Sequence, residues 1–335
     1  MVKEKKVLLA HGSGGRLSHE LIKTIAPKFS NEILNRMDDS AVFDLSGRLA
    51  FTTDSYVVSP IFFPGGDIGK LAVCGTVNDL AMCGAQALYI SLAFIIEEGL
   101  TLDELDRITG SIQKAAEEAG VRVVTGDTKV VGRGSADKLF INPAGIGTVP
   151  EGVAISGCLA KPGDKVLLGG SIGDHGMAVM SQREGLKFNI AIESDCAPLN
   201  WMVAAMLEAS KNIHVLRDPT RGGLATTLNE IASQSGVSIR LEEEAIPVQP
   251  PVRAACDFLG LDPLYVANEG KLVAFVAPQD ATAVLEAMRG NKYGRDSAII
   301  GEVSAENPGR VSMKTPLGAW RIVDMLSGEL LPRIC

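Results

Sequence analysis

Carboxylates recur beside glycine and threonine along the chain, in positions that suit the binding of a metal ion. They lie at predicted strand ends, in turns or near a helix end, and they are Asp38 and Asp39, Asp54, Asp79, Asp127 and Asp218. A single carboxylate in a turn usually caps a helix or bonds its own backbone. Five such sites favour a second interpretation, in which carboxylate oxygens hold Mg²⁺ against a polyphosphate, because this cation prefers oxygen ligands.

A thiol stands at the end of the chain, in the segment Leu331-Pro-Arg-Ile-Cys335. Chain ends are loosely held, and Pro332 disfavours a helix around it. We therefore expect residues 326–335 to form a mobile tail whose thiol travels to a reaction site. A frayed end with an incidental cysteine is the simpler interpretation of this segment taken alone.

Composition narrows the class of protein. The 335 residues are enough for about two domains, and 46% hydrophobic with 21% charged residues is typical of a globular protein. A net charge of −8 argues against a surface that binds nucleic acid or an anionic membrane. The six cysteines show no Cys-x-x-Cys spacing, which disfavours a zinc site or a disulfide framework. With an apolar N-terminal run too short for a signal peptide or a membrane span, we expect a cytoplasmic protein.

The first half of the chain alternates predicted strands and helices. Met37–Val42 and residues 49–54 predict two strands joined as a hairpin by residues 44–47. A helix is expected over residues 67–82, and the apolar run Ala87–Ile96 is typical of a strand covered on both faces. Later elements are a helix from the Thr101-Glu104 capping box to Gly120, a strand at 121–124 leading into a turn with Asp127, and a strand at 139–149. The hairpin predicts a mixed sheet.

Periodicity is lost around residues 150–163, where we place a domain boundary. The second half predicts strands at 165–168, 238–242, 271–277 and 298–303, and helices after 176, at 199–207, after 224, at 250–259 and at 279–289. We divide the chain into a flexible N-terminal segment (1–40), an N-terminal domain (41–152), a C-terminal α/β domain (153–325) and the tail (326–335).

Glycine-bearing segments offer sites for phosphate, but not of the P-loop type. No Gly-x-x-x-x-Gly-Lys-[Ser/Thr] pattern occurs, so any nucleotide site belongs to another class. The segment His11–Arg16 is either a plain loop or a lid that closes over an anion with Arg16, and both interpretations stay open.

Seven motifs together resemble one superfamily of ATP-dependent enzymes. They are Asp38-Asp-Ser-Ala-Val42, Thr52-Thr-Asp54, Asn78-Asp-Leu80, Thr125-Gly-Asp127, Gly173-Asp-His-Gly176, Arg217-Asp-Pro-Thr-Arg-Gly-Gly-Leu224 and Asn268-Glu-Gly270. The superfamily includes aminoimidazole ribonucleotide synthetase, selenophosphate synthetase and thiamine-monophosphate kinase. The terminal Pro332-Arg-Ile-Cys335 resembles, within it, the HypE family of hydrogenase maturation factors, whereas the synthetases and the kinase do not end this way.

The resemblance implies an α/β protein with mixed α+β sheets and the two-domain aminoimidazole ribonucleotide synthetase-like fold. Its N-terminal domain would bind ATP with Mg²⁺ and form a barrel in a homodimer. The implied activity is that of an ATP-dependent carbamoyl dehydratase, a lyase that yields ADP and phosphate. A HypF-type carbamoyltransferase would load the Cys335 thiol, this chain would dehydrate the carbamoyl group to a thiocyanate, and the cyanide would pass to iron on a HypC–HypD scaffold for nickel–iron hydrogenase.

The resemblance also implies roles for particular residues. Cys335 would carry the substrate, and Lys129 and Glu269 would orient phosphate and move protons. The cofactor-binding set would be Asp39, Thr53, Asp54, Asn78, Asp79, Gly126, Asp127, Arg221 and Gly222. The magnesium ligands would be Asp39, Asp54, Asp79, Asp127 and Asp218.

Two further residues keep open roles. His175 either caps a helix or approaches the tail, and Cys83 is either a small packed residue or part of a proton relay. We expect the other internal cysteines to lie in the core.

The chemistry of such a dehydration suits these residue types. A carboxamide oxygen is a poor leaving group until ATP phosphorylates it, and loss of the N–H protons then completes the nitrile. Positioning and cation neutralisation carry the phosphoryl step, and a nearby base takes the protons. Two alternatives remain: a sibling enzyme that phosphorylates a free small molecule and needs no terminal cysteine, and a non-catalytic nucleotide-sensing module without tail-dependent turnover.

Overall fold

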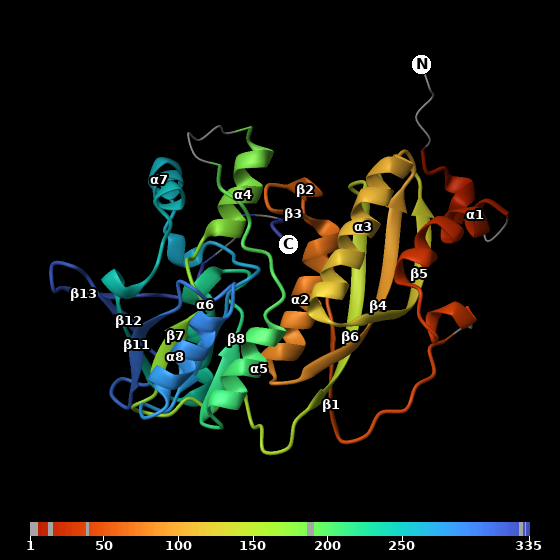
Figure 1. The fold of residues 1–335 in the computed structure, drawn as a ribbon. Helices are drawn as coiled ribbons and strands as arrows, with labels where there is room; N and C mark the ends of the chain where they lie inside the picture. Colours follow the sequence, from red (N-terminus) through yellow and green to blue (C-terminus); the bar gives the residue numbers. More distant parts are fainter. Residues whose placement is uncertain (1–5, 13–15, 38–39, 186–190, 328–330, 332) are drawn as a thin grey trace.

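Two α/β halves lie side by side in the computed structural model, with the C-terminus between them (Figure 1). The structure describes residues 6–12, 16–37, 40–185, 191–327, 331 and 333–335. The helices are α1 (Arg16–Ile25), α2 (Ile68–Met82), α3 (Leu102–Ala119), α4 (Asp174–Arg183), α5 (Asn200–Ala209), α6 (Gly223–Ser235), α7 (Pro250–Leu259) and α8 (Ala281–Gly290). Short 3₁₀ helices are η1 (Leu9–Gly12), η2 (Ala26–Phe29), η3 (Leu34–Arg36), η4 (Glu243–Ala245) and η5 (Pro263–Tyr265).

The strands form one sheet in each half and a small ribbon between β2 and β3. The N-terminal sheet has the order β1-β6-β4-β5, and the C-terminal sheet has the order β13-β12-β9-β11-β7-β10-β8. The strands are β1 (Arg48–Thr53), β2 (Phe62–Phe63), β3 (Gly66–Asp67), β4 (Gln86–Glu97), β5 (Arg122–Val131), β6 (Leu139–Val149), β7 (Lys165–Leu168), β8 (Ile213–Arg217), β9 (Ser238–Glu242), β10 (Val273–Val276), β11 (Ala298–Ser304), β12 (Val311–Lys314) and β13 (Trp320–Ile322). Both sheets combine parallel and antiparallel pairs, which confirms the prediction of mixed α/β architecture.

Helix α2 is the element on which the two halves meet. It is apolar around its whole circumference, and nearly all of its residues are buried. One side packs against the N-terminal sheet and α3, and another contacts α5 and β8 of the C-terminal half. Its N-cap Asp67 accepts from the backbone N–H groups of Gly69 and Lys70, as expected for a helix that begins at this position.

Within the part of the chain that the structure describes, helices cover one face of the N-terminal sheet and leave the other open. Ile90, Leu92 and Phe94 of β4 point into the core, whereas Ile95 on the opposite face is 39% exposed and Phe51 of β1 is 73% exposed. The prediction that the run 87–96 is covered on both faces is therefore wrong for a single chain. A continuous apolar sequence cannot tell whether the second cover comes from the same chain.

The predicted hairpin between residues 37–42 and 49–54 is also wrong. Asp38 and Asp39 lie outside the described residues, and residues 40–47 contain no strand. Strand β1 instead pairs antiparallel with β6, in the register Arg48↔Val149 to Thr53↔Ala144. Turn residues between two apolar runs are a local signal, and they do not exclude a distant strand as the partner.

A third correction concerns Asp127, which lies inside a strand and not in a turn. Strand β5 pairs parallel with β4 as far as Glu97↔Val131, so both Asp127 and Lys129 belong to it. Gly126 permits this continuation, because a Cβ atom there would overlap the Leu92 carbonyl oxygen of β4. The glycine that suggested a turn thus marks a close approach of two backbones.

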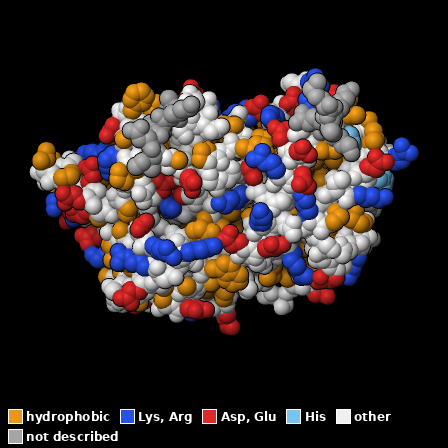
Figure 2. All heavy atoms as spheres, turned by 45° about the horizontal axis from the view of Figure 1, so that its top comes forward, with side chains coloured by type: hydrophobic (Ala, Val, Ile, Leu, Met, Phe, Trp, Pro, Cys, Tyr) orange, Lys and Arg blue, Asp and Glu red, His pale blue; other side chains and the backbone are white. Residues whose placement is uncertain are grey.

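Other elements match their predictions. Thr101 and Glu104 form the capping box of α3, which ends at Gly120 in the left-handed conformation. The strands β2, β3, β8, β12 and β13 were not predicted. No helix among the described residues is long and apolar enough to cross a membrane. On the face shown in Figure 2, basic and acidic side chains are interspersed.

Gly75 of α2 provides a test of the packing at the centre of the molecule. A Cβ atom there would overlap the hydroxyl of the buried Tyr56, so we expect Gly75→Ala to lower the free energy of unfolding by about 1–3 kcal/mol. Gly110→Ala in α3 is the control, because the nearest atom to its Cβ is Lys28 Nζ at 3.9 Å. That variant should be neutral or up to about 1 kcal/mol more stable. Urea unfolding measures both, and equal effects would contradict this packing.

Candidate active site

A cavity of about 690 Å³ lies where the two halves meet, and it gathers three of the predicted metal-binding carboxylates. Asp54 follows β1, Asp79 lies in the last turn of α2, and Asp218 follows β8. Thr52 donates a hydrogen bond to Asp79 Oδ2 over 2.8 Å, which orients that carboxylate. We call this space the acidic cavity; Thr53, Cys83, Arg217 and Arg221 also line it.

The carboxylates of the acidic cavity disfavour one another's charged form. Burial, with the neighbouring charges of Asp218 and Asp54, raises the pKa of Asp79 to about 7. Burial also raises the pKa of Asp218. A divalent cation would relieve this repulsion, so the residues present fit magnesium. Among the described residues, no three of His, Cys, Asp and Glu are grouped closely enough to hold a metal ion, so phosphate and water oxygens would have to complete its shell.

Another part of the lining of the acidic cavity suits an anion. Arg221 lines it directly before Gly222, the N-cap of α6, and no side chain caps the first turn of this helix. Gly222 and Gly223 adopt φ angles of 77° and 61°, a conformation that favours glycine. Because Arg221 is not drawn into an ion pair with a described carboxylate, its guanidinium is available to a phosphate.

The end of the chain is docked in a second cavity next to the first. This tail cavity has a volume of about 380 Å³, and Val57, Arg221 and Cys335 are among its lining residues. The tail runs antiparallel to residues 57–59, since Val57 N–H donates to the Cys335 carbonyl and Ser59 N–H donates to the Arg333 carbonyl, both over 3.3 Å. Arg221 lines both cavities, so one side chain borders the carboxylates and the thiol.

The docked thiol is kept in its neutral form. Burial, and then the nearby charge of Glu269, raises the pKa of Cys335 to about 12. An exposed cysteine thiol has a pKa of about 8.5 and is a capable nucleophile. In the docked position the thiol is instead unsuited to attack a new substrate.

Glu269 is buried beside the tail, and its backbone is held from two sides. Its N–H donates to Asp195 Oδ1 over 3.1 Å, and its carbonyl accepts from Asn78 Nδ2 over 3.2 Å. The carboxyl atom Oε1 has no hydrogen-bond partner among the described residues. Burial raises the pKa of Glu269 well above its ordinary value. Glu269 thus has a fixed backbone and one carboxyl oxygen, Oε1, that is available to bond a group attached to Cys335.

Asn78 positions the site rather than lining it. Besides Glu269, its side chain donates to the Ala197 carbonyl over 3.0 Å and accepts from Leu199 N–H over 2.8 Å. These bonds tie α2 to the loop before α5, and so they join the two halves one residue before Asp79 of the acidic cavity.

The structure shows where His175, Cys83 and the other internal cysteines lie. His175 does not cap α4 with its side chain; its Nε2 lies 2.9 Å from the Ile334 carbonyl, so it contacts the tail. Cys83 is exposed and lines the acidic cavity, so the packed interpretation is wrong. Cys158 is exposed and is not a core residue, whereas Cys74, Cys196 and Cys256 are buried as expected.

Asp127 and Lys129 lie apart from the other carboxylates. They form an ion pair of 3.0 Å on the open face of the sheet, and both are more than half exposed. Asp127, Ala93 and Asn142 follow one another across the sheet, and Asn142 donates to the Asp54 carbonyl. Asp127 is therefore three strands from Asp54, about 14 Å away.

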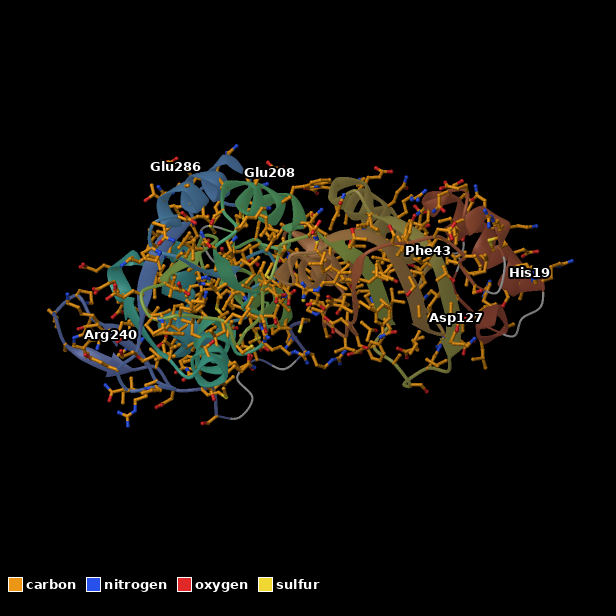
Figure 3. All side chains as sticks on the ribbon, turned by 90° about the horizontal axis from the view of Figure 1, so that it is seen from below. His19, Phe43, Asp127, Glu208, Arg240 and Glu286 are labelled. Atoms are coloured by element: carbon orange, nitrogen blue, oxygen red, sulfur yellow. The ribbon has the colours of Figure 1, made fainter. Side chains whose placement is uncertain are left out.

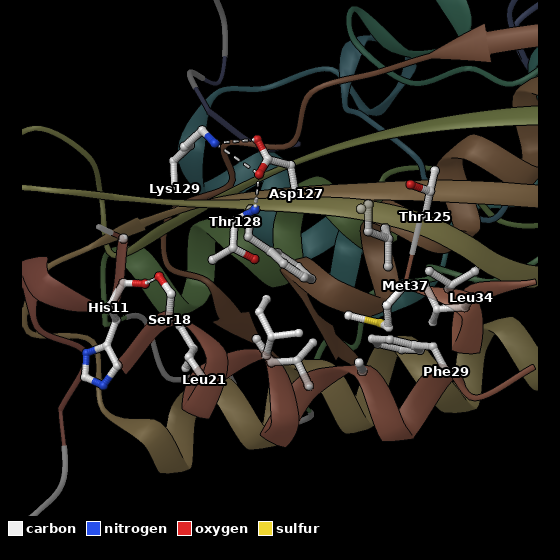
Figure 4. Close-up of a pocket in the computed structure, with 18 residues that line it drawn as sticks. His11, Ser18, Leu21, Phe29, Leu34, Met37, Thr125, Asp127, Thr128 and Lys129 are labelled. Atoms are coloured by element: carbon white, nitrogen blue, oxygen red, sulfur yellow. Dashed lines mark hydrogen bonds and ion pairs between the residues drawn. The ribbon is translucent and has the colours of Figure 1, made fainter. Parts of the chain in front are cut away.

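Figures 3 and 4 show where this ion pair lies. Figure 3 shows Asp127 in the N-terminal half, far from the labelled residues of the C-terminal half. Figure 4 shows the Asp127–Lys129 pair on one side of its strand and Ser18 and Leu21 of α1 on the other. Between α1 and the sheet the same close-up contains an apolar cavity of about 340 Å³. Of the predicted ligands, Asp39 lies outside the described residues.

Sequence reasoning missed Tyr56, which directly precedes the segment that pairs with the tail, and Arg183, which contacts the tail. Tyr56 is fully buried, and burial together with the charge of Asp54 raises the pKa of its phenol. Arg183 donates to the Arg333 carbonyl over 2.7 Å. Tyr56 follows the Thr-Thr-Asp54 motif by two positions, a signal that was available; nothing local distinguishes Arg183 in the sequence.

Comparisons with known proteins define the class first. The model of the AIR synthase related protein N-terminal domain matches residues 37–149, and that of the C-terminal domain matches residues 161–314. Thiamine-monophosphate kinase from Stenotrophomonas maltophilia shares the fold, with a TM-score of 0.69 at 18% identity over 96% of this chain and 100% of that chain. The chain is thus an AIR synthase related protein.

Closer relatives define the family within that class. Carbamoyl dehydratase HypE of Azotobacter vinelandii is 57% identical over 98% of this chain and 97% of its own length. A crystal structure of hydrogenase maturation protein HypE with ATP has a TM-score of 0.95 at 54% identity, over 98% of this chain and 99% of that chain. HypE in a HypE–HypF complex has a TM-score of 0.82 at 51% identity, over 93% and 100%. The chain belongs to the HypE family.

The raised pKa of Asp79 makes the stability of the metal-free protein depend on pH. The folded protein keeps a proton until about pH 7 that the unfolded chain releases near pH 4. This contribution is complete below the unfolded pKa and is lost as the pH rises through about 7. In EDTA, Asp79→Asn should therefore be more stable than the wild type at pH 8, by about 1 kcal/mol or more, and similar to it at pH 4.

Urea unfolding at the two pH values measures the difference. Asp44→Asn, at an exposed position, is the matched control and should change little. A stability difference for Asp79→Asn that does not vary with pH would contradict the electrostatic description of the acidic cavity.

Proposed function

We propose that this chain catalyses the ATP-dependent dehydration of a carbamoyl group on Cys335 to a thiocyanate, for the cyanide ligands of nickel–iron hydrogenase. One observation carries the proposal: the terminal thiol is docked in a cavity that shares Arg221 with the acidic cavity. A tethered substrate and a nucleotide would then meet at one guanidinium. Membership of the HypE family supports the same activity.

ATP would occupy the acidic cavity as a substrate. Asp54, Asp79 and Asp218 would hold Mg²⁺, which when bound offsets the negative charge of the phosphates and of the transferred phosphoryl group. Arg221 and the N-terminus of α6 would orient the terminal phosphate towards the carbamoyl oxygen. Thr53 borders the same space, Gly222 lines the adjoining tail cavity, and Asn78 acts indirectly through the backbone of Glu269.

Glu269 would accept protons from the carbamoyl nitrogen. Its carboxylate, once formed, is a stronger base than an exposed one, because burial favours its protonated form. As the C–O bond to the phosphorylated oxygen breaks, loss of the N–H protons forms the C≡N bond and leaves the thiocyanate on Cys335. The buried position excludes water that would hydrolyse the activated group.

The thiol must leave the tail cavity to be loaded. In the docked position its raised pKa leaves almost no thiolate, so a HypF-type carbamoyltransferase would act on the undocked tail. The product would be delivered from the undocked tail to the HypC–HypD scaffold. We place these steps in the cytoplasm.

A homodimer would complete the site. The open face of the N-terminal sheet exposes Leu49, Phe51 and Ile95, and a second copy stacked there would cover them and close a barrel. This arrangement would bring Asp127 and Lys129 of one copy towards the β1 edge and the acidic cavity of the other. The pair is too far from Asp54 to serve its own chain.

The central test is the intact mass of the protein with ATP, carbamoyl phosphate and a HypF-type transferase. We expect the wild type to gain one carbamoyl group and then to lose one water only when ATP is hydrolysed. Cys335→Ala should bind ATP normally and show neither change. If ATP is consumed without any change in mass, the chain is a sibling kinase or synthetase. Binding of ATP without turnover would identify a nucleotide-sensing module.

Glu269→Gln separates the proton-transfer step from loading. Because the amide keeps the shape but cannot accept a proton, we expect normal carbamoylation and ATP binding with dehydration slowed about 100-fold or more. Single-turnover mass spectrometry of the carbamoylated variant measures this rate. Glu244→Gln, on the short helix η4, is the control. Dehydration at the wild-type rate would remove Glu269 from the mechanism.

Mixed dimers test whether Asp127 acts across the subunit interface. Asp127→Asn and Cys335→Ala homodimers should each be inactive. After the two are unfolded and refolded together, a heterodimer contains one site with both native residues, so we expect up to about one quarter of the wild-type activity. If refolding never restores activity although heterodimers form, Asp127 does not act in the neighbouring subunit.

A further inference from the structure

The last three carbonyl groups of the chain all accept hydrogen bonds from the body of the protein. The Cys335 carbonyl accepts from Val57 N–H, and the Arg333 carbonyl accepts from Ser59 N–H. Between them, the Ile334 carbonyl faces the other way and accepts from His175. The Ile334 side chain is only 2% exposed. The chain end is thus recognised residue by residue, as an added strand would be.

The surroundings of His175 fix the hydrogen bond between its Nε2 and the Ile334 carbonyl. Because a carbonyl only accepts, Nε2 must carry the proton, and Nδ1 then accepts from the Ser194 hydroxyl at 2.8 Å. Burial lowers the pKa of His175 and keeps the ring neutral. The edge of the ring is also fixed against Phe63, with 5.3 Å between ring centroids. The donor therefore points at the tail without rearrangement.

Arg183, at the other end of α4, joins the tail to the strand-like segment beside it. Its guanidinium donates to the Ser59 carbonyl from Nε over 2.8 Å and from Nη2 over 2.6 Å. Nη2 also donates to the Arg333 carbonyl over 2.7 Å. Arg183 thus bridges the tail and residues 57–59, the same two segments that pair through the Ser59 N–H. The planar guanidinium of Arg183 therefore sets the distance between the tail and residues 57–59.

Register matters here because the thiol belongs to the last residue of an extended segment. A slip of one residue would move Cys335 by about 3.3 Å and turn its side chain to the opposite face. The side chain would then point away from Arg221 and Glu269. The N–H groups of Val57 and Ser59 can bond the carbonyl of any tail residue, so these two bonds alone do not fix the register. A donor on the other side of the tail adds a third contact that helps to fix it.

We propose that His175 and Arg183 of helix α4 form a clamp that reads the carbonyls of Ile334 and Arg333 and so sets the register in which Cys335 is presented. Both are positioning residues, since neither touches the thiol. The clamp belongs to the C-terminal half and residues 57–59 to the N-terminal half, so the docked tail is held between them (Figure 1). The clamp deepens the proposed dehydratase function, on which its catalytic consequence rests.

Alkylation of the full-length protein measures docking without any catalysis. With limiting iodoacetamide, peptide mass mapping gives the labelling rate of each cysteine. Arg183→Gln and His175→Leu should increase the labelling of Cys335 roughly tenfold or more, because each loses donors to the tail. His175→Gln keeps a donor and should lie closer to the wild type, as should Arg183→Lys. Arg240→Gln, whose exposed ion pair with Glu306 is remote from the tail, is the matched control.

The buried Cys74, Cys196 and Cys256 report general loosening in the same samples. The clamp predicts that their labelling does not change while that of Cys335 rises. Wild-type labelling of Cys335 in Arg183→Gln would overturn the proposal, and so would a parallel rise at all four positions. If His175→Leu fails to fold, Arg183→Gln and Arg183→Lys still decide the outcome.

A single-turnover measurement then separates this proposal from the function on which it rests. Carbamoylated Arg183→Gln should bind ATP as the wild type does but dehydrate its tail roughly tenfold more slowly. An unchanged rate would limit the clamp to protection of the thiol and would overturn its role in presentation. If the wild type itself fails to dehydrate the group, the proposed function fails, while the labelling rates still show whether the clamp holds the tail.

Discussion

The structure is organised around the cost of burying ionisable groups where the two halves meet. A thiol is a good nucleophile only as the thiolate, which water stabilises, whereas an activated carbamoyl group survives only where water is excluded. The docked site raises the pKa values of Cys335, Asp79 and Glu269 together, and burial is the largest cause for each. One fixed position would not suit both loading and dehydration, and in our proposal the thiol on the end of the chain avoids this conflict by moving.

Helix α2 provides the rigid base for this movement. It is buried on all sides, it ends with Asp79, and it carries Asn78, whose side chain holds the backbone of Glu269. Asp79 belongs to α2, and Asn78 fixes the backbone of Glu269 to the same helix, although Glu269 comes from the C-terminal half. The tail adds its own contacts to both halves when it docks. In our proposal, docking would assemble the site and close it in one event.

Local sequence signals predicted much of the fold. The capping box at Thr101, the glycine that ends α3 and the apolar run of α2 all depend on neighbours within a few residues, and these elements form as expected. The failures share a physical cause. The partner of β1 and the full length of β5 are decided by strands distant in sequence, and the open face of β4 depends on which elements of the fold lie over the sheet. Patterns of glycine and apolar residues carry no information about such partners.

The same limit applies to the site. Motifs beside strand ends identified Asp54, Asp79 and Asp218, which do line one cavity, and the terminal cysteine pointed to a carrier. The sequence could not show that Asp127 lies three strands away, because that follows from the order of the sheet. It also could not reveal Arg183, whose role depends on where the last residues return. The roles of these residues and the domain limits at 41–152 and 153–325 stay proposals.

The most direct test is a crystal structure of the protein carbamoylated on Cys335, with Mg²⁺ and a non-hydrolysable ATP analogue. We expect the carbamoyl group in the tail cavity, with its oxygen facing Arg221 and the terminal phosphate and its nitrogen within hydrogen-bond distance of Glu269. A loaded tail that is ordered elsewhere while the nucleotide fills the acidic cavity would contradict the proposal that both meet at this boundary.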